Sequence, residues 1–321
     1  MNESLSDLLA RAASLIRQGR NVVACMLVNA RGSTPQSAGA IMLVDDSATT
    51  YGTVGGGCIE AEIRRHALQS LHTGESRVHT FKLNHDYGWD DGLICGGTVE
   101  IAVGRLPAPD VLDSIRADIL ARRATSLSLI VADDSGDVRY ELSIPMRDRL
   151  FIVGAGHVGQ SLAKLACDLD FETWVFDDRP DLFSLPAFAN VRHVVGDIAE
   201  NLASAPIDDR TAVAILTRGH KHDEQALHAV INSSAGYIGM IGSRRKIKLI
   251  HDDLINLGVS ADRLAKVKAP IGLDIGAVSV NEIALAIAAE LIQHRSSHVH
   301  SLVTGPMPAT RASSTREPLI A

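Results

Sequence analysis

The stretch RLFIVGAGHVGQSLAKLACDLDFETWVFDDR, residues 149–179, decides the fold of the second half of the chain. It has the pattern of a buried strand, a glycine turn, a helix and a second strand. In the turn, Gly154 permits a sharp bend, Gly156 lets the backbone approach a pyrophosphate, and Gly159 allows the helix to pack closely on the strand. Asp177 ends the second strand, where a ribose hydroxyl would be bound. The stretch predicts a Rossmann-type unit, whose ligand is a nicotinamide dinucleotide, another phosphorylated molecule or none.

Strands and helices continue to alternate from this stretch to the end of a long helix expected over 279–294. Buried strands are expected at 212–217 and 237–242, with helices after each. This alternation is typical of a doubly wound parallel sheet, so we predict a Rossmann-like α/β domain over 149–294. Residues 295–321 lack periodicity and are expected to form a flexible tail.

The first half of the chain has a different pattern. Residues 1–106 combine about five apolar or alternating strands with two helices, one of them near the start of the chain, and predict an α+β domain. PAPD at 107–110 is typical of a linker, and a helix and two strands over 107–148 are expected to connect the two domains.

Composition excludes several classes of protein. The chain has 321 residues, 46% of them hydrophobic, and a formal net charge of −7, so neither wholesale disorder nor wrapping around nucleic acid is expected. No run approaches the ~18 apolar residues of a membrane span, and the first residues do not resemble a signal peptide. Four scattered cysteines favour a reducing cytoplasm, with Cys25 and Cys167 expected in the core.

A second glycine loop, Gly55, Gly56 and Gly57, precedes a helix in the first domain. Such a loop can present N–H groups to an anion. Cys58 follows where the helix begins, and a helix N-terminus favours the thiolate. Cys58 is therefore a candidate nucleophile, metal ligand or sulfur carrier, and the alternative is a small buried apolar residue. Glu60 and Glu62, in the first turn, are interpreted as stabilising the helix dipole.

Cys95, Gly96 and Gly97 repeat this combination at the edge of an expected strand. Two glycine-flanked cysteines in one domain favour a role with sulfur or a soft metal.

Polar residues follow the strand that ends near residue 217. Arg218, His220, His222 and Asp223 lie in LTRGHKHDEQAL, at a strand end where open α/β sheets bind ligands. The spacing H-x-H-D is compatible with a metal site, and contact with a polar ligand is a second possibility. The alternative is that Asp223 caps the next helix and the histidines are solvated.

GMIGSRRK, residues 239–246, repeats this arrangement at the end of the next strand. Ser243 can cap the following helix, and Arg244 and Arg245 can bind phosphate. The alternative is a basic surface cluster without a ligand.

Eight stretches, taken together and in this order, resemble the xanthine dehydrogenase accessory protein family, also called XdhC/CoxI. They are RGSTPQSAGAIMLV, GTVGGGCIEAE, CGGTVEI, LFIVGAGHVGQSLAKLA, VFDDRP, LTRGHKHD, IGMIGSRRK and APIGLDIGA. The resemblance covers residues 5–293 and agrees with the two-domain fold predicted above.

This resemblance implies a molybdenum cofactor chaperone rather than an enzyme, so no catalytic residue is named. The implied ligand is molybdopterin, a pterin dithiolene with a phosphate and in some forms a nucleotide. The implied partners are a molybdenum hydroxylase client, a cysteine desulfurase that supplies sulfur, cofactor-synthesis enzymes and a second copy of the chain. On this hypothesis Cys58, as a tentative molybdenum ligand, and Cys95 face the metal, and the loop from Gly154 to Gly159 holds the phosphate or nucleotide.

An NAD(P)-dependent oxidoreductase is the alternative from another class. The glycine loop and Asp177 favour it, but no residue set supplies a clear acid or base for hydride transfer. His157 lies inside the phosphate loop itself, which is a poor position for that role. A serine hydrolase is set aside because the chain has no nucleophile elbow of the G-x-S-x-G type.

Overall fold

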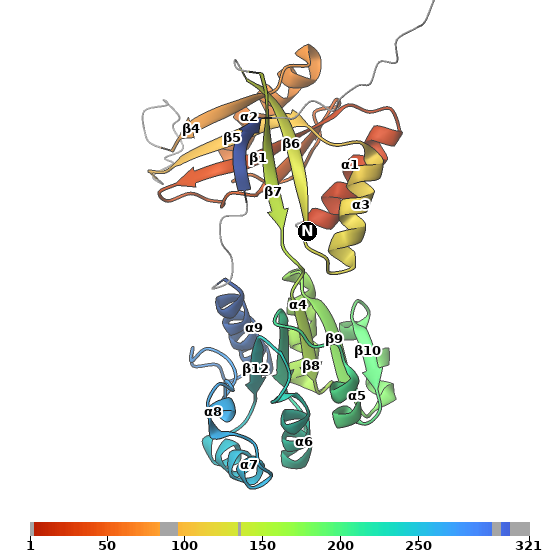
Figure 1. The fold of residues 1–321 in the computed structure, drawn as a ribbon, viewed down its shortest axis with the longest axis vertical. Coiled ribbons are helices and arrows are strands. Elements are labelled where there is room, and N and C mark those ends of the chain that lie inside the picture. Colours follow the sequence, from red (N-terminus) through yellow and green to blue (C-terminus); the bar gives the residue numbers. More distant parts are fainter. Residues whose placement is uncertain (1–2, 84–95, 134–135, 297–302, 309–321) are drawn as a thin grey trace, which may run out of the picture. The chain divides into compact units, whose positions relative to one another are not determined.

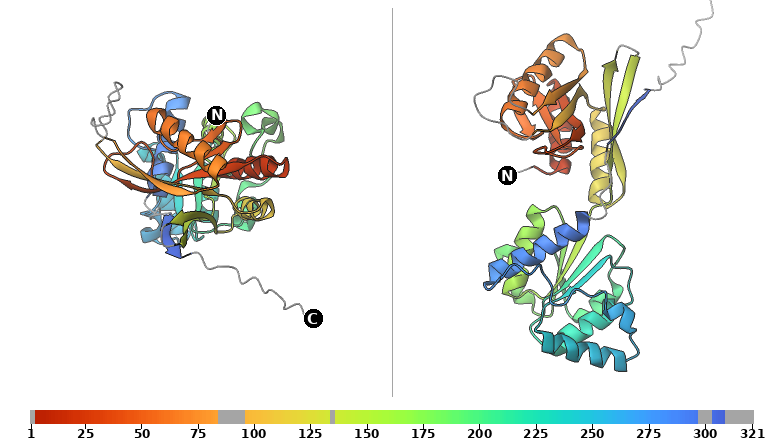
Figure 2. Two further views of the ribbon diagram at one scale, coloured as in Figure 1. Left: turned by 90° about the horizontal axis from the view of Figure 1, so that it is seen from above. Right: turned by 90° about the vertical axis from the view of Figure 1, so that its left-hand side faces the viewer.

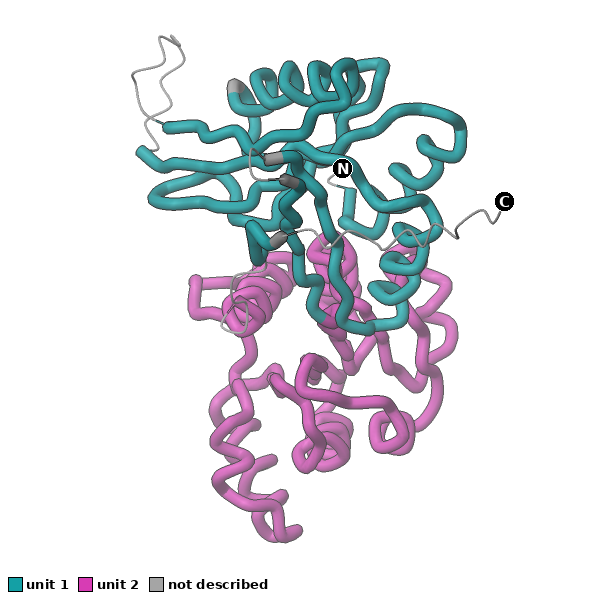
Figure 3. Tube along the Cα trace, turned by 45° about the horizontal axis from the view of Figure 1, so that its top comes forward, with its two compact units in different colours: residues 1–145, 300–321 teal, residues 146–299 magenta. Residues whose placement is uncertain are grey.

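The computed structural model describes residues 3–83, 96–133, 136–296 and 303–308, and they form two compact units. Unit 1 comprises residues 1–145 and 300–321, and unit 2 comprises residues 146–299 (Figure 3). No helix within the described ranges is long and apolar enough to cross a membrane.

An antiparallel sheet of eight strands forms the centre of unit 1 (Figure 1). Its order is β13-β7-β6-β5-β1-β2-β3, and β4 also pairs with β5. The strands are β1 (Val22–Arg31), β2 (Ile41–Asp45), β3 (Thr50–Gly52), β4 (Arg77–Lys82), β5 (Thr98–Arg105), β6 (Thr125–Asp133), β7 (Gly136–Ile144) and β13 (Val303–Pro308).

Both faces of this sheet are covered, so β1 is apolar at successive positions. Its residues Ala24 and Met26 pack with α1 (Leu5–Arg17) and α3 (Pro109–Leu120). The alternate residues, Cys25 among them, pack with α2 (Gly57–Thr73) on the other face. Cys25 is fully buried, as the sequence predicted, and burial raises the pKa of its thiol to about 12.

Unit 1 includes more of the chain than the sequence predicted. Residues 107–148 were expected to connect two domains, but α3 packs on α1, and β6 and β7 extend the sheet. Part of the expected tail forms β13, in which Val303 pairs with Leu142 of β7. Such pairings join residues far apart in sequence, and local periodicity does not reveal them.

Unit 2 has a five-stranded parallel sheet, ordered β10-β9-β8-β11-β12. The strands are β8 (Arg149–Val153), β9 (Glu172–Asp177), β10 (Arg192–Val195), β11 (Thr211–Ile215) and β12 (Tyr237–Met240). Numbered within the unit, the order is 3-2-1-4-5, which is the Rossmann order. The predicted Rossmann-like α/β fold is confirmed.

Helices cover both faces of the unit 2 sheet (Figure 2, right). On one face lie α4 (His157–Asp168) and α9 (Val280–Ser296), and their apolar residues form one core cluster. On the other lie α5 (Ile198–Ser204), α6 (His220–Val230), α7 (Arg244–Asn256) and α8 (Ala261–Leu264). Cys167, expected in the core, is partly exposed on α4.

Because α4 and α6 cover opposite faces, the strand order reverses between β8 and β11. Open α/β sheets bind their ligands at this reversal, beyond the carboxyl ends of the two strands.

Candidate functional site

Three loops of unit 1 come together at one place. Ser33 forms a parallel bridge with Gly96. A Cβ atom added to Gly97 would lie 2.4 Å from the carbonyl oxygen of Ser33, so the two backbones touch. A Cβ atom on Gly55 would lie 2.9 Å from Cγ of Pro35. The structure therefore brings the loop at 31–35 next to both predicted glycine motifs.

The glycine loop before α2 has an unusual backbone. Gly55, Gly56 and Gly57 have φ angles of 141°, 81° and 52°, which side-chain-bearing residues rarely adopt. A Cβ atom on Gly56 or Gly57 would meet no heavy atom within 4 Å. These two glycines are thus required by backbone conformation and not by crowding, and they leave the start of α2 open.

Glu60 closes part of this loop. Its carboxylate accepts a hydrogen bond of 3.0 Å from the N–H of Gly56 and another from the Thr53 hydroxyl. The Thr53 hydroxyl also accepts from the N–H of Gly55, at 3.3 Å. An internal carboxylate thus occupies the position that the sequence hypothesis gave to an external anion. The other N–H groups of the first turn of α2 have no partner within the helix.

The two candidate cysteines differ in what the structure describes. Cys58 is the second residue of α2, directly after the glycine loop, as the sequence predicted. Cys95 lies outside the described residues. Gly96 and Gly97, which follow it, lie against the loop at 31–35.

In unit 2 the loop from Gly154 to Gly159 has the geometry that its sequence predicts. A Cβ atom on Gly154 would lie 2.5 Å from the carbonyl oxygen of Leu216, and one on Gly159 would lie 2.1 Å from that of Gly154. Gly156 is the N-cap of α4, has no neighbour within 4 Å of a Cβ position, and provides no side-chain cap. The N–H groups at the start of α4 are therefore accessible to an anion.

Asp177 stabilises this loop through hydrogen bonds to its buried carboxylate. It is buried, and its carboxylate accepts from the N–H of Ala155 at 2.7 Å and from Nε and Nη2 of Arg179 at 2.8 and 2.9 Å. Burial alone would raise the pKa of Asp177, but the hydrogen bonds from Arg179 and Ala155 outweigh it and lower the pKa to about 2. Both oxygens are thus engaged within the protein, and ribose binding by Asp177 requires displacing one of these donors.

The next residue, Asp178, is more open. Its carboxylate accepts a hydrogen bond of 2.7 Å from Nη2 of Arg218, and both side chains are partly exposed. Arg218 follows β11, across the strand-order reversal from the glycine loop. Gly219, the N-cap of α6, again provides no side-chain cap. Two uncapped helix N-termini, of α4 and α6, therefore follow the adjacent strands β8 and β11.

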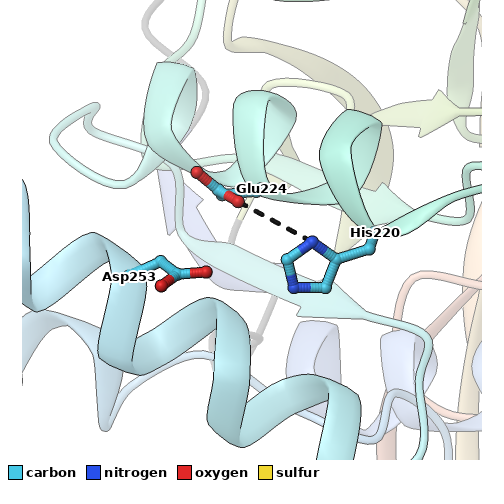
Figure 4. A group of neighbouring side chains, drawn as sticks. All are labelled: His220, Glu224 and Asp253. Atoms are coloured by element: carbon cyan, nitrogen blue, oxygen red, sulfur yellow. Dashed lines mark ion pairs between the residues drawn. The ribbon is translucent and has the colours of Figure 1, made fainter.

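The residues of the predicted H-x-H-D site separate in the structure. Asp223 is fully buried, accepts from the backbone N–H of Thr217 at 3.2 Å, and forms an ion pair with Lys246. Asp223 is therefore unavailable to a metal beside His222, and it does not cap α6. His220 turns instead toward Glu224 and Asp253 (Figure 4).

Ser243, Arg244 and Arg245 lie at the start of α7. Ser243 is the N-cap and accepts a hydrogen bond of 3.3 Å from the N–H of Lys246, as its residue type predicts. Both arginines are exposed, and within the described ranges neither forms an ion pair with a carboxylate. They remain available to an external anion.

Several pairings that shape this site were not predicted from the sequence, namely those of Asp178, Arg179, Glu224, Lys246 and Asp253. The stretch VFDDR contains a usable signal, because an arginine two residues after a strand-end aspartate can fold back on it. The pairings of Lys246 and Asp253 with α6 depend on how two helices pack, which spacing along the chain does not reveal.

Comparison with known proteins places both units in one family. Residues 150–291 match the family model of the XdhC Rossmann domain, and residues 15–82 match that of the XdhC and CoxI family. A crystal structure of a xanthine dehydrogenase from Bacillus halodurans has the same fold, with a TM-score of 0.78 and 23% identity over 91% of this chain and 97% of that one.

Three relatives align over most of the chain. YqeB of Escherichia coli, an uncharacterised protein, is 27% identical over 94% of this chain, which spans only 48% of YqeB. The molybdenum cofactor insertion chaperone PaoD of E. coli is 27% identical, over 90% of this chain and 88% of PaoD. A probable subunit of xanthine dehydrogenase from Bacillus subtilis is 24% identical, over 88% of this chain and 96% of that one. The chain therefore belongs to the XdhC and CoxI family, as its eight motifs predicted.

Proposed function

We propose that this chain is a molybdenum cofactor chaperone, which binds the cofactor and delivers it to a molybdenum hydroxylase. Two relatives support the proposal by their names, one a cofactor insertion chaperone and the other a probable subunit of xanthine dehydrogenase. The cofactor is the cargo of the chain, which supplies binding groups and no catalytic residue.

One observation carries the proposal, namely the pair of uncapped helix N-termini at the strand-order reversal of unit 2. The glycine N-caps Gly156 and Gly219 leave backbone N–H groups of α4 and α6 without side-chain partners. Arg218 adds a partly exposed guanidinium beside Gly219, paired there with the carboxylate of Asp178. Molybdopterin has a terminal phosphate, and phosphate is the ligand for which backbone N–H groups and a guanidinium are suited. We assign the phosphate or nucleotide end of the cofactor to this position.

Unit 1 holds a separate candidate site, which suits a metal or a sulfur atom and depends on the residues of unit 1 alone. The loops at 31–35, 55–57 and 96–97 meet there, and the open backbone at Gly56 and Gly57 allows close approach of a bulky group. Cys58 follows as the second residue of α2, and its residue type suits molybdenum or a sulfur atom in transit.

Finer parts of the proposal come from the family resemblance. They are exchange of an oxo ligand for sulfido with sulfur from a cysteine desulfurase, contact with cofactor-synthesis enzymes, a homodimer, and action in the cytoplasm. Each has a direct test, such as co-purification with a desulfurase or the mass of the chain in solution.

The decisive experiment is cofactor loading under anaerobic conditions. The purified chain is mixed with molybdopterin cofactor, separated from free cofactor, and analysed for molybdenum by mass spectrometry. We expect stoichiometric molybdenum, and less of it in Arg218→Ala and Cys58→Ala. Arg210→Ala is a matched control, because Arg210 precedes the amino end of β11 and pairs with Asp148 there. Absence of molybdenum from the wild-type chain would reject the proposal.

NAD(P)-dependent oxidation is the second candidate function. The close packing at Gly154 and Gly159 favours a dinucleotide. The engaged carboxylate of Asp177 disfavours it, because this is the group that would bind the ribose. Calorimetric titration with NAD⁺ and NADP⁺ decides the question, since a dehydrogenase must bind one of them.

A further inference from the structure

Three side chains that can bind metal ions meet between α6 and α7. They are His220 and Glu224, one turn apart on α6, and Asp253 on α7 (Figure 4). Their nitrogen and oxygen ligand atoms all lie within 4.8 Å of one another, and Nδ1 of His220 is 3.8 Å from a carboxylate oxygen of Glu224. Ligand atoms that surround a tetrahedral ion at ~2.1 Å are about 3.4 Å apart, so small side-chain rotations would complete the geometry.

The two helices hold these side chains together through their buried faces. Ala226, Leu227 and Val230 of α6 share one apolar cluster with Ile247, Ile250 and Leu254 of α7. An ion pair between the buried Asp223 and the partly exposed Lys246 also joins the two helices. The three ligands are therefore brought together by packing that does not depend on any attraction among them.

Charge makes this arrangement unfavourable without a cation. Glu224 and Asp253 are two carboxylates from different helices, and within the described part of the chain neither forms an ion pair with a lysine or arginine. Glu224 lies close to His220, which is charged only when protonated. Like charges held at this separation repel each other, and a cation between them removes that repulsion. Asp253 also lies in the last turn of α7, where the helix dipole favours a cation.

We propose that His220, Glu224 and Asp253 form a binding site for a divalent transition-metal ion, with Zn²⁺ as the representative. One imidazole nitrogen with two carboxylate oxygens suits Zn²⁺ and disfavours Mg²⁺, which prefers oxygen alone. His220 and Asp253 are exposed, so water completes the coordination. The ion would link the start of α6 to the end of α7. The proposal does not rest on the proposed cofactor function, although His220 is the first residue of α6, whose N-terminus is assigned to the phosphate.

The test is calorimetric titration of the metal-free full chain with ZnCl₂ alone. Asp253→Asn replaces the carboxylate ligand by a neutral amide, and His220→Ala removes the imidazole. Their matched controls are Asp252→Asn on α7 and His228→Ala on α6, both at exposed positions. We expect Asp253→Asn and His220→Ala to lose one zinc equivalent or to bind it roughly tenfold or more weakly. Both controls should bind zinc like the wild type. Comparison of variants separates this site from zinc bound by other histidines.

A second readout is thermal unfolding of the full chain, measured with zinc and with a chelator. Zinc should raise the midpoint for the wild type and both controls but not for Asp253→Asn. Equal zinc binding by Asp253→Asn and the wild type would overturn the proposal, as would equal loss in Asp253→Asn and Asp252→Asn. No molybdenum cofactor is present, so failure here is distinct from failure of the chaperone proposal.

Discussion

The two glycine loops of this chain look alike in sequence and differ in physical role. In unit 2, Gly154 and Gly159 are required because neighbouring backbone leaves no room for a Cβ atom. In unit 1, Gly56 and Gly57 have open space, and their positive φ angles are what require glycine. An internal carboxylate, that of Glu60, fills the loop of unit 1, whereas the helix start at Gly156 has no side-chain cap.

This difference shows that a glycine-rich helix start is not by itself an anion site. The N–H groups must also be free of internal acceptors. By that criterion the unit 2 loop is the better phosphate site. The unit 1 loop is better suited to close approach of a bulky group to its backbone. Substitutions in and around the two loops test this distinction.

The largest effect is expected for Gly159→Ala. The new Cβ atom would lie 2.1 Å from the carbonyl oxygen of Gly154, which belongs to the backbone and cannot rotate away as a side chain can. We expect unit 2 to lose about 3 kcal/mol of unfolding free energy. Urea unfolding followed by the fluorescence of Trp174 in β9 measures it, in a Trp89→Phe background so that one tryptophan remains.

Gly156→Ala is the matched control in the same loop, because its Cβ position is open and its φ is −69°. We expect a loss below about 1 kcal/mol, since glycine is only moderately better than alanine as an N-cap. Equal losses for the two variants would contradict the assignment of crowding to Gly159.

Asp177→Asn is expected to lower the unfolding free energy by about 2 kcal/mol at pH 7. The ionised carboxylate holds the Arg179 guanidinium and the N–H of Ala155, and the neutral amide holds both less well. The pKa of Asp177 falls from 3.8 to about 2 on folding, so the ionised form stabilises the folded state. This contribution is complete above pH 3.8 and is lost as the pH falls toward 2.

Unfolding free energies of the wild type and Asp177→Asn, measured from pH 7 down to pH 2, check this directly. The difference between the two proteins should shrink as the pH falls. A difference that stays constant with pH would show that the charge of Asp177 contributes nothing to folding.

Glu60→Ala is expected to destabilise unit 1 by about 1 kcal/mol, because the N–H of Gly56 loses its acceptor. Glu60→Gln keeps an oxygen at that place and should lose less than half as much. Hydrogen exchange at the Gly56 amide provides the readout, with faster exchange expected in the alanine variant only. Unchanged exchange in Glu60→Ala would show that the loop does not need an internal acceptor.

The smallest effect on stability is expected for Arg218→Ala. Its ion pair with Asp178 is partly exposed, and such pairs contribute below about 1 kcal/mol. Stability should therefore stay close to that of the wild type while cofactor binding falls. A large loss of stability would mean that Arg218 serves the fold and not a ligand.

The fold of unit 2 could be predicted from sequence because its information is local. The turn at Gly154–Gly159 lies directly between the strand and helix that it joins, and the following strands and helices alternate within short windows. The sheet of unit 1 could not be ordered in this way. Its neighbours β13 and β7 are separated by more than a hundred residues, and nothing near Val303 marks its partner.

The positions of the candidate site residues could be predicted from the sequence, but their charged partners could not. Residue types at strand ends located Gly156, Arg218 and Ser243, because parallel strands place their carboxyl ends together. The partners of the charged groups were not predictable. Arg179 engages Asp177, and Lys246 engages Asp223, through side-chain packing that no periodicity encodes.

Molybdenum bound per chain after anaerobic loading measures whether the chain binds the molybdenum cofactor. We expect stoichiometric molybdenum in the wild type and a clear decrease in Arg218→Ala at unchanged stability. A wild-type chain that is folded, loaded under the same conditions and free of molybdenum would contradict it.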